Sequence, residues 1–214
     1  EKLLESLEEM KSLDVSTENC HVIEADITEE EQEDRACSTV KGLCDSLYGL
    51  VNNAALPPRA EVHCPLQEES LEYWERLFRT NVTAPWLLTR TIFPHMKKGV
   101  EARVLFITSE AGWAFTPGFG PYNLSKAALN NLCGSMAEEY AATFPEVDIQ
   151  MNALVAGEAR TEMNPNSKES PYSIVSMALI LLSHQKGGPN GKFFHRDGRH
   201  LQFAYAASYN KSLL

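Results

Sequence analysis

The sequence has 214 residues, of which 43% are hydrophobic, and its formal net charge is −10. This length and apolar content fit one domain with its own core, so we predict a single domain over residues 1–214. The acidic balance disfavours a nucleic acid partner, because the phosphate backbone selects a basic surface. The apolar run at 174–182 is far shorter than the ~20 residues of a membrane span, so we expect no membrane partner.

The five cysteines form no CxxC pair and lie at no metal-ligand spacing from a histidine. We therefore predict no metal site and expect reduced thiols, as in a reducing compartment. No basic and then apolar signal opens the sequence. These features predict a soluble protein of the cytosol or an organelle, and we take cytoplasmic as the predicted location.

The first elements are read from their hydrophobic periodicity. Residues 1–13 carry apolar side chains on one stripe, which predicts an amphipathic helix. Residues 21–27 alternate between apolar and polar side chains, which predicts a strand. Thr28 and Glu31 have the spacing of a capping box, so we expect the next helix to begin there.

Residues 47–54 predict a short buried strand, and a proline-rich loop follows at 57–65. Residues 70–98 predict a long helical stretch that passes through Asn81. The apolar run at 102–109 is typical of a parallel strand buried on both faces.

The later part of the chain continues the same alternation. Its predicted elements are a helix at 122–143, a strand at 148–157, a loop or lid at 158–172, a helix at 173–183, and a last strand and turn at 191–201. Strands that alternate with helices predict an α/β fold with a parallel sheet.

Tyr122 and Lys126 stand four residues apart, on one face of the predicted helix. A phenol titrates near pH ~10, and a cation beside it favours the phenolate and lowers its pKa. Such a pair can serve as a tuned proton donor and acceptor. Taken alone, however, this spacing is common among pairs of surface residues, and an ordinary surface pair would be the better interpretation.

Ser109 changes this balance because it ends a predicted buried strand, where open α/β sheets place their ligand crevice. A hydroxyl there can hydrogen-bond a carbonyl oxygen on which charge develops. The structural alternative is a serine that opens a turn. The joint occurrence of Ser109, Tyr122 and Lys126 favours a catalytic site.

The spacing of these residues closely resembles that of the short-chain dehydrogenase/reductase family: a serine, a tyrosine thirteen positions later, and a lysine four after that. The segment 51–55, VNNAA, resembles the family's NNAG, with Ala55 where glycine is usual. The segment 79–90 resembles the one that carries the family's catalytic asparagine, which places that role on Asn81. The segment 24–28 resembles the adenine-contacting one, and 155–163 resembles PGxxxT, with Ala156 in place of proline. The resemblance covers about residues 1–203.

The resemblance implies a Rossmann-like, doubly wound parallel sheet in three layers, and an NAD or NADP cofactor that exchanges a hydride with an alcohol or carbonyl. It makes Tyr122 the general acid/base, with Lys126 lowering the phenol's pKa and holding the ribose. Ser109 would orient the carbonyl, and Asn81 would position a water. The implied cofactor-binding residues are Asp26, Ile27, Asn53, Ala54, Tyr122, Lys126, Gly157, Ala159 and Thr161.

Each of these residues also has a structural interpretation. Asp26 precedes the predicted Thr28 cap, and Asn53 suits a turn. Asn81 suits a helix break, with Pro85 restarting the helix one turn later. Thr161 could cap a short helix at 161–164. Trp113 and Phe115 could form a substrate wall or only pack within their loop. For His195 and His200 we favour structural or surface roles.

The family opens with a strand, a glycine-rich turn and a helix whose N-terminus receives the pyrophosphate. The glycines before residue 100 are Gly42, Gly49 and Gly99, and none forms such a turn. We therefore expect a partial domain that lacks roughly 35–40 N-terminal residues relative to the family, including its first two strands. The strand at 21–27 would then lack a neighbour, and the strand at 47–54 would have an open edge.

The predicted function is an NAD(P)-dependent oxidoreductase that acts on a small-molecule alcohol or carbonyl. The alternative is a catalytically silent interaction or oligomer-forming subunit, or an inactive fragment, that cannot hold the dinucleotide. We also expect a homo-oligomer through the helices near 70–98 and 122–143, because the family commonly pairs in this way.

Overall fold

The computed structural model describes residues 2–58, 65–161 and 164–201. A five-stranded sheet with the order β1-β2-β3-β4-β5 lies at its centre. The first four strands are parallel, and β5 runs antiparallel to β4. Their bounds are β1 Gly49–Asn52, β2 Glu101–Thr108, β3 Asp148–Val155, β4 Phe193–His195 and β5 His200–Leu201.

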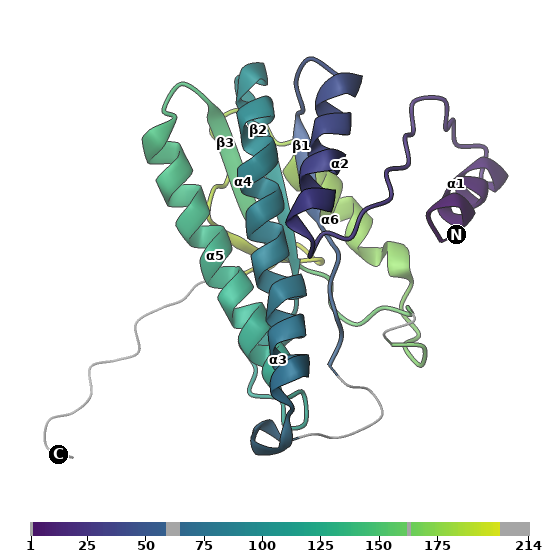
Figure 1. Cartoon of the computed structure of the whole chain (residues 1–214), viewed down its shortest axis with the longest axis vertical. Helices are drawn as coiled ribbons and strands as arrows, with labels where there is room; N and C mark the ends of the chain where they lie inside the picture. The colour runs from purple at the N-terminus through teal and green to yellow at the C-terminus, as the bar shows by residue number, and fades with distance from the viewer. Residues whose placement is uncertain (1, 59–64, 162–163, 202–214) are drawn as a thin grey trace, which may run out of the picture.

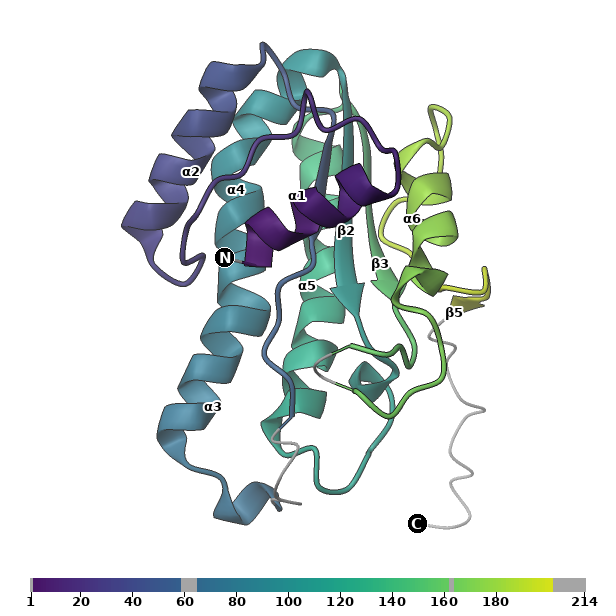
Figure 2. The ribbon, with the colours of Figure 1, turned by 90° about the vertical axis from the view of Figure 1, so that its right-hand side faces the viewer.

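Helices cover both faces of this sheet (Figures 1 and 2). The helices α2 Glu30–Leu43, α4 Ala84–Met96 and α5 Pro121–Thr143 lie on one face, and α6 Val175–Leu182 lies on the other. Along β2, Val104 and Phe106 pack under the first group, whereas Leu105 packs under α6. The α/β fold with a mostly parallel sheet is therefore confirmed.

The helical stretch predicted at 70–98 is interrupted at Asn81. It consists of α3 Leu71–Phe78, a π-helical turn at Arg79–Thr83, α4, and a 3-10 turn at Lys97–Gly99. Pro85 lies in the first turn of α4 and has no N–H to donate to the preceding turn, so the helical hydrogen-bond pattern is interrupted there. The helix break suggested for Asn81 does not occur, because the π turn widens the helix and the backbone stays helical through Thr83 and Ala84.

Two predictions for the N-terminal part are wrong. Residues 21–27 form no strand, because a strand requires a hydrogen-bonded neighbour and none lies beside them among the described residues. The capping box also does not form: α2 begins at Glu30, its N-cap Glu29 makes no side-chain cap, and the Thr28 hydroxyl donates to Asp26 instead. The helix α1 (Lys2–Ser12) is confirmed, and its Glu9 accepts a hydrogen bond from Tyr172.

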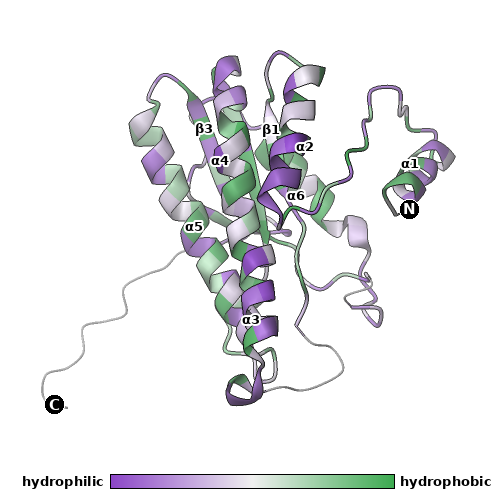
Figure 3. Cartoon of the chain, in the orientation of Figure 1, coloured by the Kyte–Doolittle hydropathy of each residue, from purple (hydrophilic) through white to green (hydrophobic). Residues whose placement is uncertain are grey.

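The edge of β1 that faces away from β2 pairs with no strand in the described part of the chain. Val51 is 44% exposed there. The helix α6 is largely apolar (Figure 3), and its side chains Val175, Leu179 and Ile180 are exposed. The open edge predicted for the strand at 47–54 is thus present in the structure.

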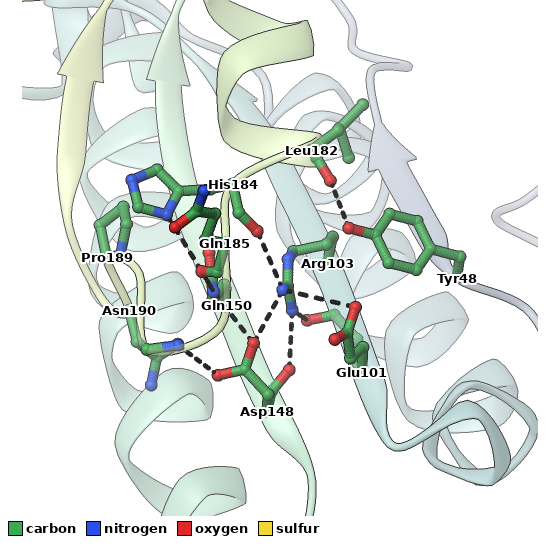
Figure 4. Close-up of polar contacts among 12 residues, drawn as sticks. Tyr48, Glu101, Arg103, Asp148, Gln150, Leu182, His184, Gln185, Pro189 and Asn190 are labelled. Carbon is green, nitrogen blue, oxygen red and sulfur yellow. Dashed lines mark hydrogen bonds and ion pairs between the residues drawn. The ribbon is translucent and has the colours of Figure 1, made fainter.

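The end of the sheet where β2 and β3 begin is held by Arg103, which is 1% exposed (Figure 4). Its guanidinium lies 2.7 Å from the Asp148 carboxylate and donates to the carbonyl of His184. Asp148 in turn accepts from the Gly187 N–H at 2.9 Å. These contacts fasten the connection between α6 and β4 to the sheet.

Thr161 and Asn164 pair as an isolated bridge, and the middle of the short helix predicted at 161–164 lies outside the described residues. The helix predicted at 173–183 is a 3-10 turn at Pro171–Ile174 followed by α6. Most of the predicted loop at 57–65 lies outside the described residues. Within the described residues, no helix is long and apolar enough to cross a membrane.

Candidate active site

Ser109 directly follows β2, at the carboxyl edge of the parallel sheet. Its neighbour Thr108 is in register with Val155, the last residue of β3. The Ser109 Oγ accepts a hydrogen bond from the Ala111 N–H at 3.2 Å and so opens the 3-10 turn Glu110–Gly112. This is the predicted turn-opening role, but it uses only one lone pair of the hydroxyl, whose proton can still be donated.

Tyr122 lies in the first turn of α5, and this helix packs against the 3-10 turn Glu110–Gly112 that follows Ser109. It is 7% exposed and packs with Leu77 and Ala111. Burial raises the pKa of its phenol above the ordinary value, and a hydrogen bond with the Ser109 side chain opposes this rise. The two residues that the sequence assigned to the substrate oxygen therefore act on each other directly.

Lys126 is 3% exposed and donates from Nζ to the Ile107 carbonyl at 3.2 Å. The same nitrogen lies 5.6 Å from the centroid of the Tyr122 ring. Burial lowers the pKa of Lys126 to about 8. The prediction that this cation lowers the pKa of Tyr122 is wrong for this structure, because desolvation dominates at the phenol and the ammonium is anchored on a backbone carbonyl.

Asn81 is 1% exposed and makes three hydrogen bonds within the protein. Its Oδ1 accepts from the Leu56 N–H at 2.7 Å, and its Nδ2 donates to the Leu56 carbonyl and to Ser125 Oγ, both at 3.1 Å. The Ser125 hydroxyl in turn donates a hydrogen bond to the Tyr122 carbonyl at 2.8 Å. Asn81 thus ties the chain after β1 to the helix that carries Tyr122 and Lys126, and its Oδ1 keeps one acceptor position.

Apart from Tyr122 and Lys126, the predicted cofactor-binding residues fall into two groups. Asn53 and Ala54 are exposed just after β1, and Gly157 and Ala159 follow β3, so all lie at the sheet edge of Ser109. Thr161 is exposed in the same segment.

Asp26 and Ile27 belong to the second group, which precedes α2. The Asp26 carboxylate accepts from the Thr28 hydroxyl at 2.7 Å and from the Thr28 N–H at 2.9 Å, and these bonds lower the pKa of Asp26. This supports its structural interpretation. Ile27 lines a cavity of about 270 Å³ between the start of α2 and α4, beside Trp86.

Sequence reasoning missed the contacts of His195, for which it favoured a structural or surface role. His195 is buried, with Nδ1 2.8 Å from Asp197 and Nε2 3.4 Å from Glu110, the residue after Ser109. It also missed Ser125, whose place between Tyr122 and Lys126 was the available signal. Trp113 packs edge-on against the ring of Phe193.

Comparison with known proteins identifies the family. Residues 1–171 match the family model described as short chain dehydrogenase. The chain belongs to the short-chain dehydrogenase/reductase family. This confirms the predicted family and its class, oxidoreductases.

Among curated short-chain dehydrogenase/reductase relatives, dehydrogenase/reductase SDR family member 4 of Homo sapiens is 32% identical over 154 residues, which are 72% of this chain and 51% of that protein. Cyclopentanol dehydrogenase of Comamonas testosteroni is 29% identical over 153 residues, 72% of this chain and 58% of that protein. The chain thus spans about half the length of the curated relatives it matches.

Solved structures of this family share the fold. The oxidoreductase yciK from E. coli aligns with a TM-score of 0.70 and 23% identity, over 80% of this chain and 71% of that one. A short chain dehydrogenase from Salmonella enterica aligns with a TM-score of 0.70 and 22% identity, over 80% and 72%.

Proposed function

We propose that this protein interconverts a small-molecule alcohol and a carbonyl, with NAD or NADP as cofactor and Tyr122 as general acid/base. The observation that carries the proposal is the convergence of Ser109, Tyr122 and Lys126 at the carboxyl edge of the sheet. This is where parallel α/β sheets form their ligand crevices.

The donor chemistry of the buried lysine fits a dinucleotide. Its ammonium has three N–H groups, and one of them reaches the Ile107 carbonyl. The others can donate to ribose hydroxyls, while Asn53, Ala54, Gly157, Ala159 and Thr161 line the same edge. The cofactor supplies hydride exchange when it is bound.

The raised pKa of Tyr122 keeps the phenol protonated at neutral pH, which suits proton donation to a substrate oxygen during carbonyl reduction. Ser109 holds that oxygen by a second hydrogen bond. The pKa of Lys126 is lowered to about 8, so this buried ammonium can release and take up a proton close to neutral pH, beside Tyr122.

The test is nicotinamide oxidation by the full-length protein with NADH and NADPH over a panel of aldehydes and ketones, for the wild type and Tyr122→Phe. We expect turnover with the wild type and a loss of at least ~100-fold with the variant, the usual contribution of a general acid. Retained turnover in a folded variant would remove Tyr122 from this role.

The second candidate is an interaction or oligomer-forming subunit, and one observation favours such a surface on α5. A hollow of about 690 Å³ runs along this helix, and it is lined by small or polar side chains, among them Ala127, Gly134 and Ser135. We propose a homo-oligomer through α5 and the α3–α4 stretch, in the cytoplasm. Light scattering should then give an average mass that rises with protein concentration above that of one chain.

A further inference from the structure

The residues that follow β4 lie beside the candidate active site. His195 pairs with Val155, the last residue of β3, and Val155 in turn pairs with Thr108, next to Ser109. The N–H of Arg196 donates to the Val155 carbonyl at 3.0 Å. The side chain of Arg196 therefore leaves the sheet at the edge that carries the predicted cofactor segment.

Arg196 binds both ends of the segment 157–173, which connects β3 to α6. Its Nη1 donates to the Glu158 carbonyl and to Ser173 Oγ, both at 2.7 Å. Its Nη2 lies 3.7 Å from the Glu169 carboxylate. The Arg196 side chain is 17% exposed, so these charged contacts are only partly screened by solvent.

Gly157 allows the guanidinium to approach the backbone of this segment. Its φ is +66°, and a Cβ at this position would lie 3.0 Å from Nε and 3.1 Å from Cζ of Arg196. A side chain on residue 157 would thus both strain the backbone and displace the arginine. Gly157 is also the first of the predicted cofactor-binding residues after β3.

The neighbouring His195 contacts the other side of the site through Glu110, 3.4 Å away. The end of β4 is therefore joined to the turn after Ser109 and to both ends of the segment 157–173. The planar guanidinium holds its N–H donors in a fixed geometry and can donate to acceptors in different directions. A lysine ammonium on a flexible side chain lacks this fixed geometry.

We propose that Arg196 is a positioning residue for the cofactor: it holds Glu158 and Ser173 so that Gly157, Ala159 and Thr161 keep their place beside Ser109 and Tyr122. This inference rests on the proposed function, because it assumes that the segment faces a bound nicotinamide. It adds a residue that the spacing of Ser109, Tyr122 and Lys126 does not indicate.

The test compares Arg196→Gln and Arg196→Lys with Arg199→Gln. Arg199 is a matched control, since it follows the same strand and pairs with Asp197, but makes no hydrogen bond or ion pair with the described residues of the segment 157–173. Hydrogen exchange measured by mass spectrometry reports the segment, and NADPH fluorescence reports both affinity and the surroundings of the nicotinamide.

We expect Arg196→Gln to speed exchange in 157–173 and to weaken NADPH binding about tenfold, the usual effect of losing a charged hydrogen bond. The emission shift of bound NADPH should shrink as well, Arg196→Lys should rescue little, and Arg199→Gln should match the wild type. Ser173→Ala, which removes one of the bonds and keeps the arginine, should act in the same direction if Arg196→Gln unfolds.

Unchanged exchange, or faster exchange with unchanged NADPH affinity and emission, would overturn the positioning role. A wild-type protein that binds neither NADH nor NADPH would instead refute the proposed function, and the inference would fall with it. The two failures are therefore distinguishable by the wild-type titration alone.

Discussion

Asn81 binds the backbone of Leu56 through both atoms of its amide, at 2.7 Å from Oδ1 to the Leu56 nitrogen and 3.1 Å from Nδ2 to the Leu56 oxygen. This double contact joins positions that are 25 residues apart. It fixes the chain just after Asn53 and Ala54, so the position of these two predicted cofactor-binding residues depends on a buried side chain of the π turn.

Asn81→Asp should destabilise the fold, because the carboxylate cannot donate to the Leu56 carbonyl or to Ser125. Buried polar groups left unpaired cost about 1–3 kcal/mol each, so we expect a loss of about 2–4 kcal/mol in urea unfolding. The exposed Asn53→Ala should change the free energy of unfolding by less than about 0.5 kcal/mol. Similar stabilities for the two variants would show that the clamp contributes nothing.

Lys126 predicts a pH dependence with a defined sign. Its folded pKa of about 8 lies below the ordinary lysine value of 10.5, so the folded state loses its proton first and the free energy of unfolding rises between pH 8 and 10. The difference of about 2.5 pKa units corresponds to about 2–4 kcal/mol in full. Above pH 10 the raised pKa of Tyr122 acts in the opposite direction, because its folded state keeps a proton that the unfolded state releases.

Denaturant unfolding of the wild type and Lys126→Met at pH 7.5 and 9.5 would measure this effect. The methionine variant should be the more stable at pH 7.5 and should lack the rise. A wild type whose stability falls over this range, relative to the variant, would contradict the assignment.

Asp148→Asn should be strongly destabilising because it leaves the Arg103 guanidinium buried without its anionic partner (Figure 4). Removing one member of a buried ion pair costs about 3–5 kcal/mol. Glu101→Gln is the control, since Glu101 is 42% exposed and 3.8 Å from Arg103. Thermal unfolding should separate the two variants clearly, and equal melting temperatures would argue against the network.

The open edge of β1 predicts self-association, because its backbone groups can pair with a strand of another molecule. Val51→Lys places a charge on this edge without disturbing the core, since Val51 is 44% exposed. Sedimentation velocity should show fewer oligomers for the variant at equal concentration. A distribution identical to the wild type would place any association elsewhere, for example on α5.

Much of the site followed from local patterns. Neighbouring residues alone predict the buried run of β2, the serine that follows it, Ser109, and the helical spacing of Tyr122 and Lys126. These features could therefore be predicted from the sequence. The direction of the Tyr122 pKa shift did not follow, because burial depends on packing by Leu77 and Ala111 from distant segments.

Long-range pairing accounts for the other differences. Residues 21–27 have the alternation of a strand, but a strand forms only where another supplies hydrogen bonds, and the described chain has none beside them. The Asn81–Leu56 clamp and the Arg196 hydrogen bonds likewise join residues that are 23 to 38 positions apart. Periodicity and capping report the conformation of a few adjacent residues, whereas such contacts exist only after the chain has folded back on itself.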